Sequence, residues 1–378
     1  MAQIPVYLDY NATTPVDKKV LDAMLPFFNT NFGNAASSTH VEGWKAKAAV
    51  DIARNQVAQL ISANPEELIF TSGATESCNL AIQGLFEKYG AIKNEIIVPS
   101  TEHPAVLDTC KALKRKGAEI VILNTNRSGR LDPDDLKKKV TEKTLLVCAM
   151  LVNNETGVIQ PIKELVELAH LHNAFFFCDA TQATGKIHVD VNDLGVDMLC
   201  LSAHKMYGPK GTGGLFVGRK SPRMQLSPII FGGGHESALR SGTLNVPGIV
   251  GFGKSCEIAS QEMMSLAADV SVLRTSFEQQ ILDLGSVYIN GSTKHRVGNT
   301  SSLCFEGRKA ADIISKTQGR LCVSVGSACS SASAQPSHVL LAMGFSKAEA
   351  EATIRFSFGK YNTKEEVARA VELIRLAI

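Results

Sequence analysis

Lys205 is the residue whose surroundings most clearly suggest covalent chemistry. It lies in the segment Ser202–Gly211 (SAHKMYGPKG), directly after the apolar run Val196–Leu201, and the glycines and proline of this segment end any regular element. A lysine held in a tight turn at a strand end, beside hydrogen-bond donors, can present its amine to an aldehyde cofactor and form a Schiff base. A surface lysine in a Gly/Pro loop would show the same local pattern, so the segment alone leaves both interpretations open.

A second candidate is a phosphate site that follows the predicted strand Leu68–Thr71. The chain continues as Ser72–Glu76, where Gly73 permits a tight turn before a helix that begins near Ala74. The free N–H groups at the start of that helix and the Thr75 hydroxyl suit a phosphate. Because many helices begin in this way, an ordinary helix start is the alternative.

Two further predicted strands end in side chains that could contact an aromatic ring. Glu95–Val98 leads to His103, which could stack on a ring, move protons or simply cap the next helix. Thr144–Val152 leads to Asn153 and Asn154, two adjacent amides that a turn would also explain. Neither segment alone decides between a chemical and a structural role.

Asp179 follows the five apolar residues Ala174–Cys178, so its carboxylate should be partly desolvated and should need a cation nearby. A protonated pyridine nitrogen is such a cation, and the acid would make the ring a better electron sink. A cap of the next turn is the alternative. Ligands of open α/β sheets bind at the carboxyl ends of the strands, and Asp179 and Lys205 end consecutive strands. A phosphate site, an acid, amides and a lysine at one sheet edge together indicate pyridoxal phosphate.

Cys329 is the one thiol in Ser324–Ala334, a stretch of small residues without an apolar face. Buried structural cysteines sit among large apolar residues, as Cys148 and Cys178 do in this sequence. A mobile, exposed thiol is a better nucleophile, and nearby cations such as His103 would favour its ionised form. A plain linker that contains a cysteine is the alternative.

The elements that would position these residues alternate between apolar strands and helices. Strands are predicted at Leu68–Thr71, Glu95–Val98, Glu119–Leu123, Thr144–Val152, Ala174–Cys178, Asp197–Leu201 and Gly213–Val217. Helices are predicted from near Ala74 and Pro104, and at Asp132–Val140 and Pro161–His172. Short apolar strands separated by helices indicate βαβ units and a mostly parallel α/β sheet covered on both faces.

The remaining elements divide the chain into an arm and two domains. Ser37 or Ser38 could cap a helix to about Ile61, with Trp44, Ala48 and Ile52 on one face. A long helix is predicted from Gly248 to Ile281 and leads to a second unit. Its strands are predicted at Ser286–Ile289, Thr300–Phe305 and Ile354–Phe358, and its helices at Lys309–Thr317, at Pro336–Met343 and at the C-terminus. On the C-terminal helix, one apolar stripe is formed by Val367, Val371, Ile374 and Ile378. We expect an N-terminal arm at 1–14, a large cofactor-binding domain at 15–258 and a small domain at 259–378 that carries Cys329.

Composition favours a cytoplasmic enzyme. The 378 residues are 44% hydrophobic and carry a formal charge of +2, which gives no reason to expect direct binding of nucleic acid or of a membrane. The chain has no apolar run near the roughly 18 residues of a transmembrane helix and no signal peptide at its start. Its nine cysteines include no CxxC pair, which favours free thiols over disulfides or a metal site.

Motifs along residues 6 to about 360 resemble those of cysteine desulfurases of the NifS/IscS type. The matching segments, in the order that this family shows, are Leu8–Thr14, Gly33-Asn34, Thr71–Ser77, Thr101–His103, Asn153–Gly157, Asp179–Gln182, Ser202–Gly211, Gly232–His235, Arg240–Thr243, Gly326–Cys329 and Ile354–Ser357. The Gly-Ser-Ala-Cys segment is similar to that of the group with a long mobile catalytic loop. The resemblance implies a type I fold of the class V aminotransferase kind, pyridoxal phosphate as cofactor and a homodimer.

The resemblance also implies roles for individual residues. Lys205 would carry the cofactor and move the α-proton, and His103 would stack on the ring. The full set of implied cofactor contacts is Ala74, Thr75, His103, Asn154, Asp179, Gln182, Ser202, His204, Lys205 and, from the partner subunit, Thr243. Within this set Gln182 and Asn154 would hold the phenolic oxygen of the ring, while Thr75, Ser202 and His204 would bind phosphate. Asn34 and Arg355 would bind the substrate carboxylate, for which a planar guanidinium is suited.

The reaction implied is the conversion of L-cysteine to L-alanine, with a persulfide formed on Cys329 and passed to a protein acceptor. Selenocysteine lyase is the nearest alternative. The third interpretation is a type I aminotransferase, which needs no cysteine nucleophile, and the fourth is a non-catalytic scaffold that retains the fold. Ala35 stands where many relatives have proline, and Cys78 where Asp or Asn is common. The housekeeping iron–sulfur enzymes carry a further C-terminal tail that this sequence lacks, which counts against general iron–sulfur assembly, while tRNA thiolation, DNA phosphorothioation and a dedicated pathway stay open for the acceptor.

Overall fold

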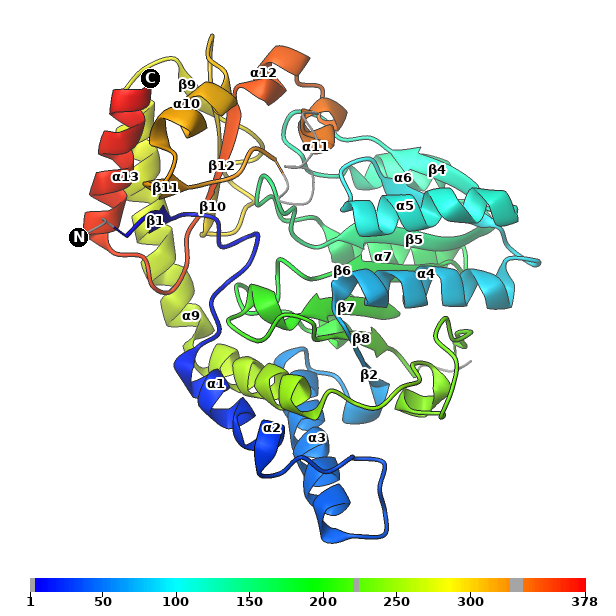
Figure 1. The fold of residues 1–378 in the computed structure, drawn as a ribbon. Coiled ribbons are helices and arrows are strands. Elements are labelled where there is room, and N and C mark those ends of the chain that lie inside the picture. The colour runs from blue at the N-terminus through cyan, green and yellow to red at the C-terminus, as the bar shows by residue number, and fades with distance from the viewer. Residues whose placement is uncertain (1–3, 220–223, 327–335) are drawn as a thin grey trace.

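A seven-stranded sheet forms the centre of the computed structural model, which describes residues 4–219, 224–326 and 336–378 (Figure 1). The strand order is β2-β8-β7-β6-β5-β3-β4. The bounds are β2 (Leu68–Thr71), β3 (Glu95–Pro99), β4 (Glu119–Leu123), β5 (Thr144–Met150), β6 (Phe175–Asp179), β7 (Met198–Ser202) and β8 (Gly213–Val217). Only β8 runs antiparallel to its neighbours in this sheet. The predicted mostly parallel α/β sheet is confirmed.

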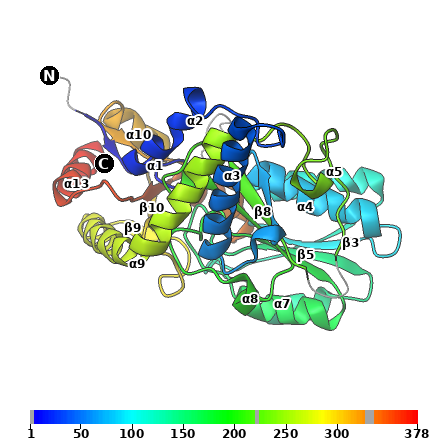
Figure 2. The same cartoon turned by 90° about the horizontal axis from the view of Figure 1, so that it is seen from below.

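Helices cover both faces of this sheet, as Figure 2 shows from below. The helices are α1 (Lys18–Met24), α2 (Pro26–Asn29), α3 (Val41–Leu60), α4 (Ala74–Tyr89), α5 (Pro104–Leu113), α6 (Pro133–Lys139), α7 (Ile162–Leu171), α8 (Val191–Leu194) and α9 (Val246–Leu282). Strand β5 is buried along its whole length; Leu146 and Cys148 join one hydrophobic cluster, and Val147 and Ala149 join the other. A strand buried on both faces must be apolar throughout, which explains the continuous hydrophobic runs in the sequence.

The first long helix differs from the sequence prediction. Helix α3 begins at Val41, and the His40 imidazole, rather than Ser37 or Ser38, accepts the capping hydrogen bond from the Gly43 N–H. The predicted face of Trp44, Ala48 and Ile52 is exposed, whereas Ala46, Val50, Ala53 and Val57 are buried. The small residues decide the packing, because α9 lies so close that a Cβ on Gly253 would be 2.5 Å from the Ala53 Cα.

A smaller unit packs beside the sheet and contains both ends of the chain (Figure 1). A three-stranded antiparallel sheet has the order β12-β10-β9, and β1 pairs in parallel with β11. The bounds are β1 (Val6–Tyr7), β9 (Val287–Ile289), β10 (Thr300–Phe305), β11 (Leu321–Cys322), β12 (Thr353–Ser357), α10 (Ala310–Thr317), α11 (His338–Ala342), α12 (Lys347–Glu351) and α13 (Lys364–Ala377). The predicted stripe of α13 faces the core, since Val367, Val371 and Ile374 are buried.

Helix α9 connects the two units and runs without interruption through the predicted domain boundary at residue 258. Its Phe252 and Cys256 belong to a core cluster of the large sheet, whereas Val270 and Phe277 belong to the cluster of the smaller unit. The division into 15–258 and 259–378 therefore stays a prediction. Among the described residues, no helix combines the length and apolar character needed to cross a bilayer.

Candidate active site

A cavity of about 420 Å³ lies at the carboxyl ends of the parallel strands. Its lining includes ten of the thirteen residues singled out by sequence: Ala74, Thr75, His103, Asn154, Asp179, Gln182, Ser202, His204, Lys205 and Arg355. Asn34 and Thr243 are exposed and do not line this cavity in the single chain. Cys329 lies outside the described residues.

Lys205 ends a single 3-10 turn, Ala203–Lys205, directly after β7. Its ammonium donates to the backbone carbonyls of Asn11 (2.6 Å) and Ala12 (2.7 Å). The turn is tight because Gly208 packs on Ala203, where a Cβ would lie 2.9 Å from the Ala203 Cβ. Lysine at this position is thus fixed by the backbone rather than free on the surface.

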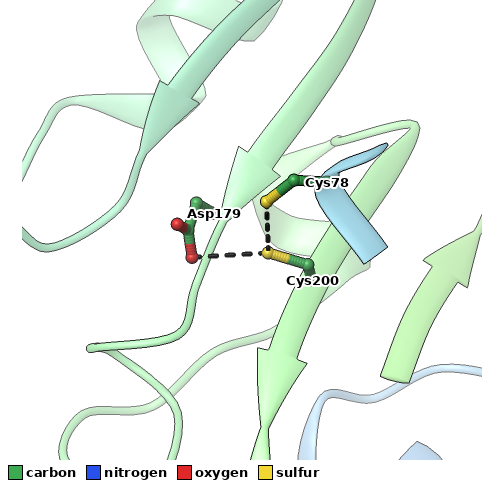
Figure 3. A group of neighbouring side chains, drawn as sticks. All are labelled: Cys78, Asp179 and Cys200. Carbon is green, nitrogen blue, oxygen red and sulfur yellow. Dashed lines mark hydrogen bonds between the residues drawn. The ribbon is translucent and has the colours of Figure 1, made fainter. Parts of the chain in front are cut away.

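Asp179 is the last residue of β6 and is buried beside the cavity. Its Oδ1 accepts hydrogen bonds from the Thr181 N–H (2.9 Å) and from the Cys200 thiol (3.4 Å). The Cys200 sulfur is in turn 3.7 Å from the Cys78 sulfur (Figure 3). Asp179 therefore does stabilise the following turn, as the structural alternative proposed, and it also faces the cavity.

His103 caps α5, with its Nδ1 accepting a hydrogen bond from the Ala105 N–H at 3.1 Å. This bond leaves the proton of the neutral ring on Nε2. Burial lowers the pKa of His103 below its ordinary value, against the opposing charge of Asp179. The tautomer and the lowered pKa both favour an uncharged ring in the ligand-free chain, so the expectation that His103 supplies a cation to the catalytic thiol gains no support here and stays a prediction.

We expect nitrogen NMR of the ligand-free chain to show His103 as the neutral Nε2–H tautomer at pH 7, with its titration midpoint below 6.5. Protonation of Nδ1 would break the hydrogen bond from the Ala105 N–H, and it would also place a charge in a buried position. A midpoint at or above 6.5, or a protonated Nδ1 at neutral pH, would contradict this geometry.

The end of the cavity near α4 has the features of an anion site. Helix α4 begins at Ala74, directly after Gly73, whose φ of 149° strongly favours glycine. Thr75 and Ser202 line the cavity beside this helix start. Burial, with a contribution from the neighbouring ammonium, lowers the pKa of His204 to about 4, so in the ligand-free chain this ring is neutral and can donate a hydrogen bond to an anion.

The amide pair has two different roles. Asn153 is a turn residue, as the structural alternative predicted, because its Oδ1 accepts from the backbone N–H groups of Glu155 (3.0 Å) and Thr156 (2.9 Å). Asn154 lines the cavity. The carbonyl of Asn154 accepts from Arg355 Nη1 at 3.1 Å, which ties the large sheet to β12.

Arg355 is almost fully buried on β12, with its Nη2 2.6 Å from Asp9 Oδ1. Its buried Nε has no hydrogen-bond partner among the described residues. A guanidinium has five N–H donors, and the carboxylate and the carbonyl account for two of them, so it is suited to bind a further carboxylate.

Several residues that shape the site are not among those predicted from the sequence. The carbonyls of Asn11 and Ala12 hold the lysine, and Asp9 holds the arginine. Lys186 donates to Gln182 Oε1 at 2.5 Å and to Asn11 Oδ1 at 2.9 Å, and burial holds its pKa well below its ordinary value. A contact made by a backbone carbonyl cannot be predicted from residue types. The contact of Lys186 with Gln182 could have been predicted, because the lysine lies four residues after the glutamine.

Comparisons with known proteins agree with this geometry. The family model "Aminotransferase class-V" matches residues 6–370. A cysteine desulfurase IscS from Anaeromyxobacter sp. (strain Fw109-5) is 48% identical over 375 residues, covering 98% of this chain and 92% of that protein. A solved NifS-like protein superposes with a TM-score of 0.92 at 36% identity and 99% coverage of both chains. SspA in complex with cysteine gives a TM-score of 0.84 at 38% identity, covering 94% of this chain and 99% of the other.

Proposed function

Because this chain belongs to the class-V aminotransferase family and its close relatives are cysteine desulfurases, we propose that it converts L-cysteine to L-alanine and passes the sulfur to a protein acceptor. The observation that carries the proposal is that a single cavity brings together Lys205, Asp179 and Arg355. These residues come from three separate elements, and each has the chemistry that one part of an amino-acid reaction needs.

The lining of the cavity fits pyridoxal phosphate. The start of α4, with Thr75, Ser202 and neutral His204, would take the phosphate. Asp179, buried beside the cavity, would pair with the ring nitrogen, and His103 would stack on the ring. Gln182 and Asn154 would hold the phenolic oxygen. When bound, the cofactor supplies a sink for the electrons left at the substrate Cα.

The residues of the chain then divide the work on the substrate. Arg355, held by Asp9 and the Asn154 carbonyl, would bind the cysteine carboxylate through its remaining N–H donors. Lys205, once its ammonium leaves the carbonyls of Asn11 and Ala12, would hold the cofactor and move the proton at Cα. Asn34 is proposed to assist with the carboxylate from a neighbouring subunit, since it lies outside its own cavity.

Cys329 is proposed as the residue that carries the persulfide. The eight cysteines among the described residues are free, but seven are buried and Cys322 is half-buried. Burial raises the pKa of Cys178, Cys256 and Cys322, which keeps these thiols protonated at neutral pH. The low reactivity of the described thiols is consistent with a nucleophilic role for Cys329. The described cysteines form no disulfides, which supports a cytoplasmic location.

A homodimer is proposed as the active form. Phe28, Phe32, Trp44 and Phe231 are large aromatic side chains exposed on the single chain. Thr243 is also exposed and lies close in sequence to the Ile230–Arg240 bridge, beside Phe231. Covering these aromatics with a second copy would bury apolar area and bring Thr243 toward the partner's cavity.

The test is a product assay with the purified chain and pyridoxal phosphate. L-cysteine should give alanine and bound sulfur in equal amounts, and added thiol should release that sulfur as sulfide. Activity confined to L-selenocysteine would favour the lyase, and pyruvate formed with a keto-acid acceptor would favour the aminotransferase. No turnover of any of these substrates would leave only the scaffold interpretation.

A further inference from the structure

Two buried thiols stand directly behind the carboxylate that faces the cavity. Cys78 comes from α4, Cys200 from β7 and Asp179 from the end of β6, so three elements bring their side chains to one point (Figure 3). One ligand atom from each lies within 4.8 Å of the other two. All three residues are buried. The family chemistry described above uses only the carboxylate of this group.

Two of the three spacings match those around a tetrahedral ion. Zn²⁺ with Zn–S bonds of about 2.3 Å and a Zn–O bond of about 2.0 Å holds two sulfurs about 3.8 Å apart and a sulfur and an oxygen about 3.5 Å apart. The two sulfurs of Cys78 and Cys200 are 3.7 Å apart, and the Cys200 sulfur is 3.4 Å from Asp179 Oδ1. The third spacing, between the Cys78 sulfur and the carboxylate, lies within 4.8 Å, so these two groups would move toward each other around an ion.

The charge also balances. In the metal-free chain the Cys200 thiol donates to Asp179 and the Cys78 thiol is paired with Cys200, so the group carries two S–H protons and the single charge of the carboxylate. A divalent cation would break the two S–H bonds, form two metal–sulfur bonds and one metal–oxygen bond, and release two protons to solvent. The net charge of the buried group would not change, so the exchange avoids the cost of burying new charge.

We propose that Cys78, Cys200 and Asp179 form a binding site for a thiophilic divalent cation such as Zn²⁺, with its fourth position open to the cavity. Cys78 and Asp179 both line that cavity, which gives the ion an entry path and a place for water. An ion bound to Asp179 Oδ1 would draw on the carboxylate charge that the ring nitrogen of the cofactor needs. Exclusion of pyridoxal phosphate by the metal rests on the proposed function, whereas the site itself does not.

The test uses Co²⁺ as a spectroscopic probe of the full chain. Cys322 and Cys329 are replaced by serine throughout, so that the accessible thiols do not bind the probe. The cofactor-free chain should bind one Co²⁺, with sulfur-to-cobalt charge-transfer bands and the visible bands of a tetrahedral ion. The holoenzyme should take up Co²⁺ only as it releases cofactor, and added pyridoxal phosphate should displace the metal.

Variants assign the ligands. Cys78→Ser and Cys200→Ser should each lower the charge-transfer intensity per bound ion by about half, because each removes one of two thiolates. Cys256→Ser, which alters an equally buried thiol on α9 near Met206, should leave the spectrum unchanged. If a variant fails to fold, X-ray absorption of the Zn²⁺-loaded background chain still reports two sulfur ligands. Absence of binding, or bands undiminished in both cysteine variants, would overturn the site; binding that cofactor does not affect would overturn only the proposed competition.

Discussion

Replacement of Lys205 by alanine is expected to abolish turnover and the covalent attachment of pyridoxal phosphate. Two carbonyls, of Asn11 and Ala12, fix the amine at the cavity, where one side chain would both hold the cofactor and move the proton at Cα. Loss of a positioned acid–base group alone lowers the rate about 10³-fold, and loss of the covalent link to the cofactor lowers it further.

Borohydride reduction followed by peptide mapping measures the attachment. The wild-type chain should carry the reduced cofactor on Lys205, and the alanine variant should carry none. Lys210→Ala is the matched control, because Lys210 also lines the cavity but is exposed, and it should keep the link. Cofactor fixed to Lys186 or Lys210 in the wild-type chain would remove Lys205 from the mechanism.

Replacement of Cys329 by serine is expected to leave binding of cofactor and L-cysteine intact while nearly all alanine formation and all persulfide are lost. A hydroxyl is a far poorer nucleophile toward sulfur than a thiolate is. A nearby cation would favour the thiolate, and the buried guanidinium of Arg355 in the substrate site is the cation we expect it to approach.

Mass spectrometry after brief exposure to cysteine locates the sulfur. One added sulfur atom should be found on Cys329 in the wild-type chain. Cys322→Ser is the control, because that half-buried thiol has a raised pKa and lies on β11 opposite Tyr7 of β1, so its loss should leave alanine formation close to normal. Added sulfur on Cys322 or Cys78, together with an active Cys329→Ser variant, would exclude the mechanism.

The sequence predicted the strands of the large sheet well, because a strand buried on both faces must be apolar throughout. It did not predict the parallel pairing of Val6 with Leu321 or the exposed face of α3. Trp44 and Ile52 have the helical spacing and the hydrophobicity of core residues, yet the close approach of α9 selects the small side chains instead. Such choices depend on a partner element far away in the sequence, which local patterns do not contain.

The site was predictable where a reactive side chain follows a strand. Asp179 and Lys205 could be found because topology brings the ends of neighbouring parallel strands together. The carbonyl acceptors of Asn11 and Ala12 carry no signal in residue type. The spacing of Cys78 and Cys200 in the sequence resembles no metal-binding motif, although the fold places the two sulfurs 3.7 Å apart.

The order of synthesis gives the N-terminal arm an unusual position. Residues 6 to 11 leave the ribosome long before their partners do, because Val6 pairs with Leu321, Asp9 with Arg355 and the Asn11 N–H with Ser357. The arm therefore stays without these partners until residues 321 to 357 have been translated. Because this arm carries the carbonyls that hold the reactive lysine, the nascent protein cannot complete its amine-binding pocket early, and maturation with cofactor becomes an event that follows translation.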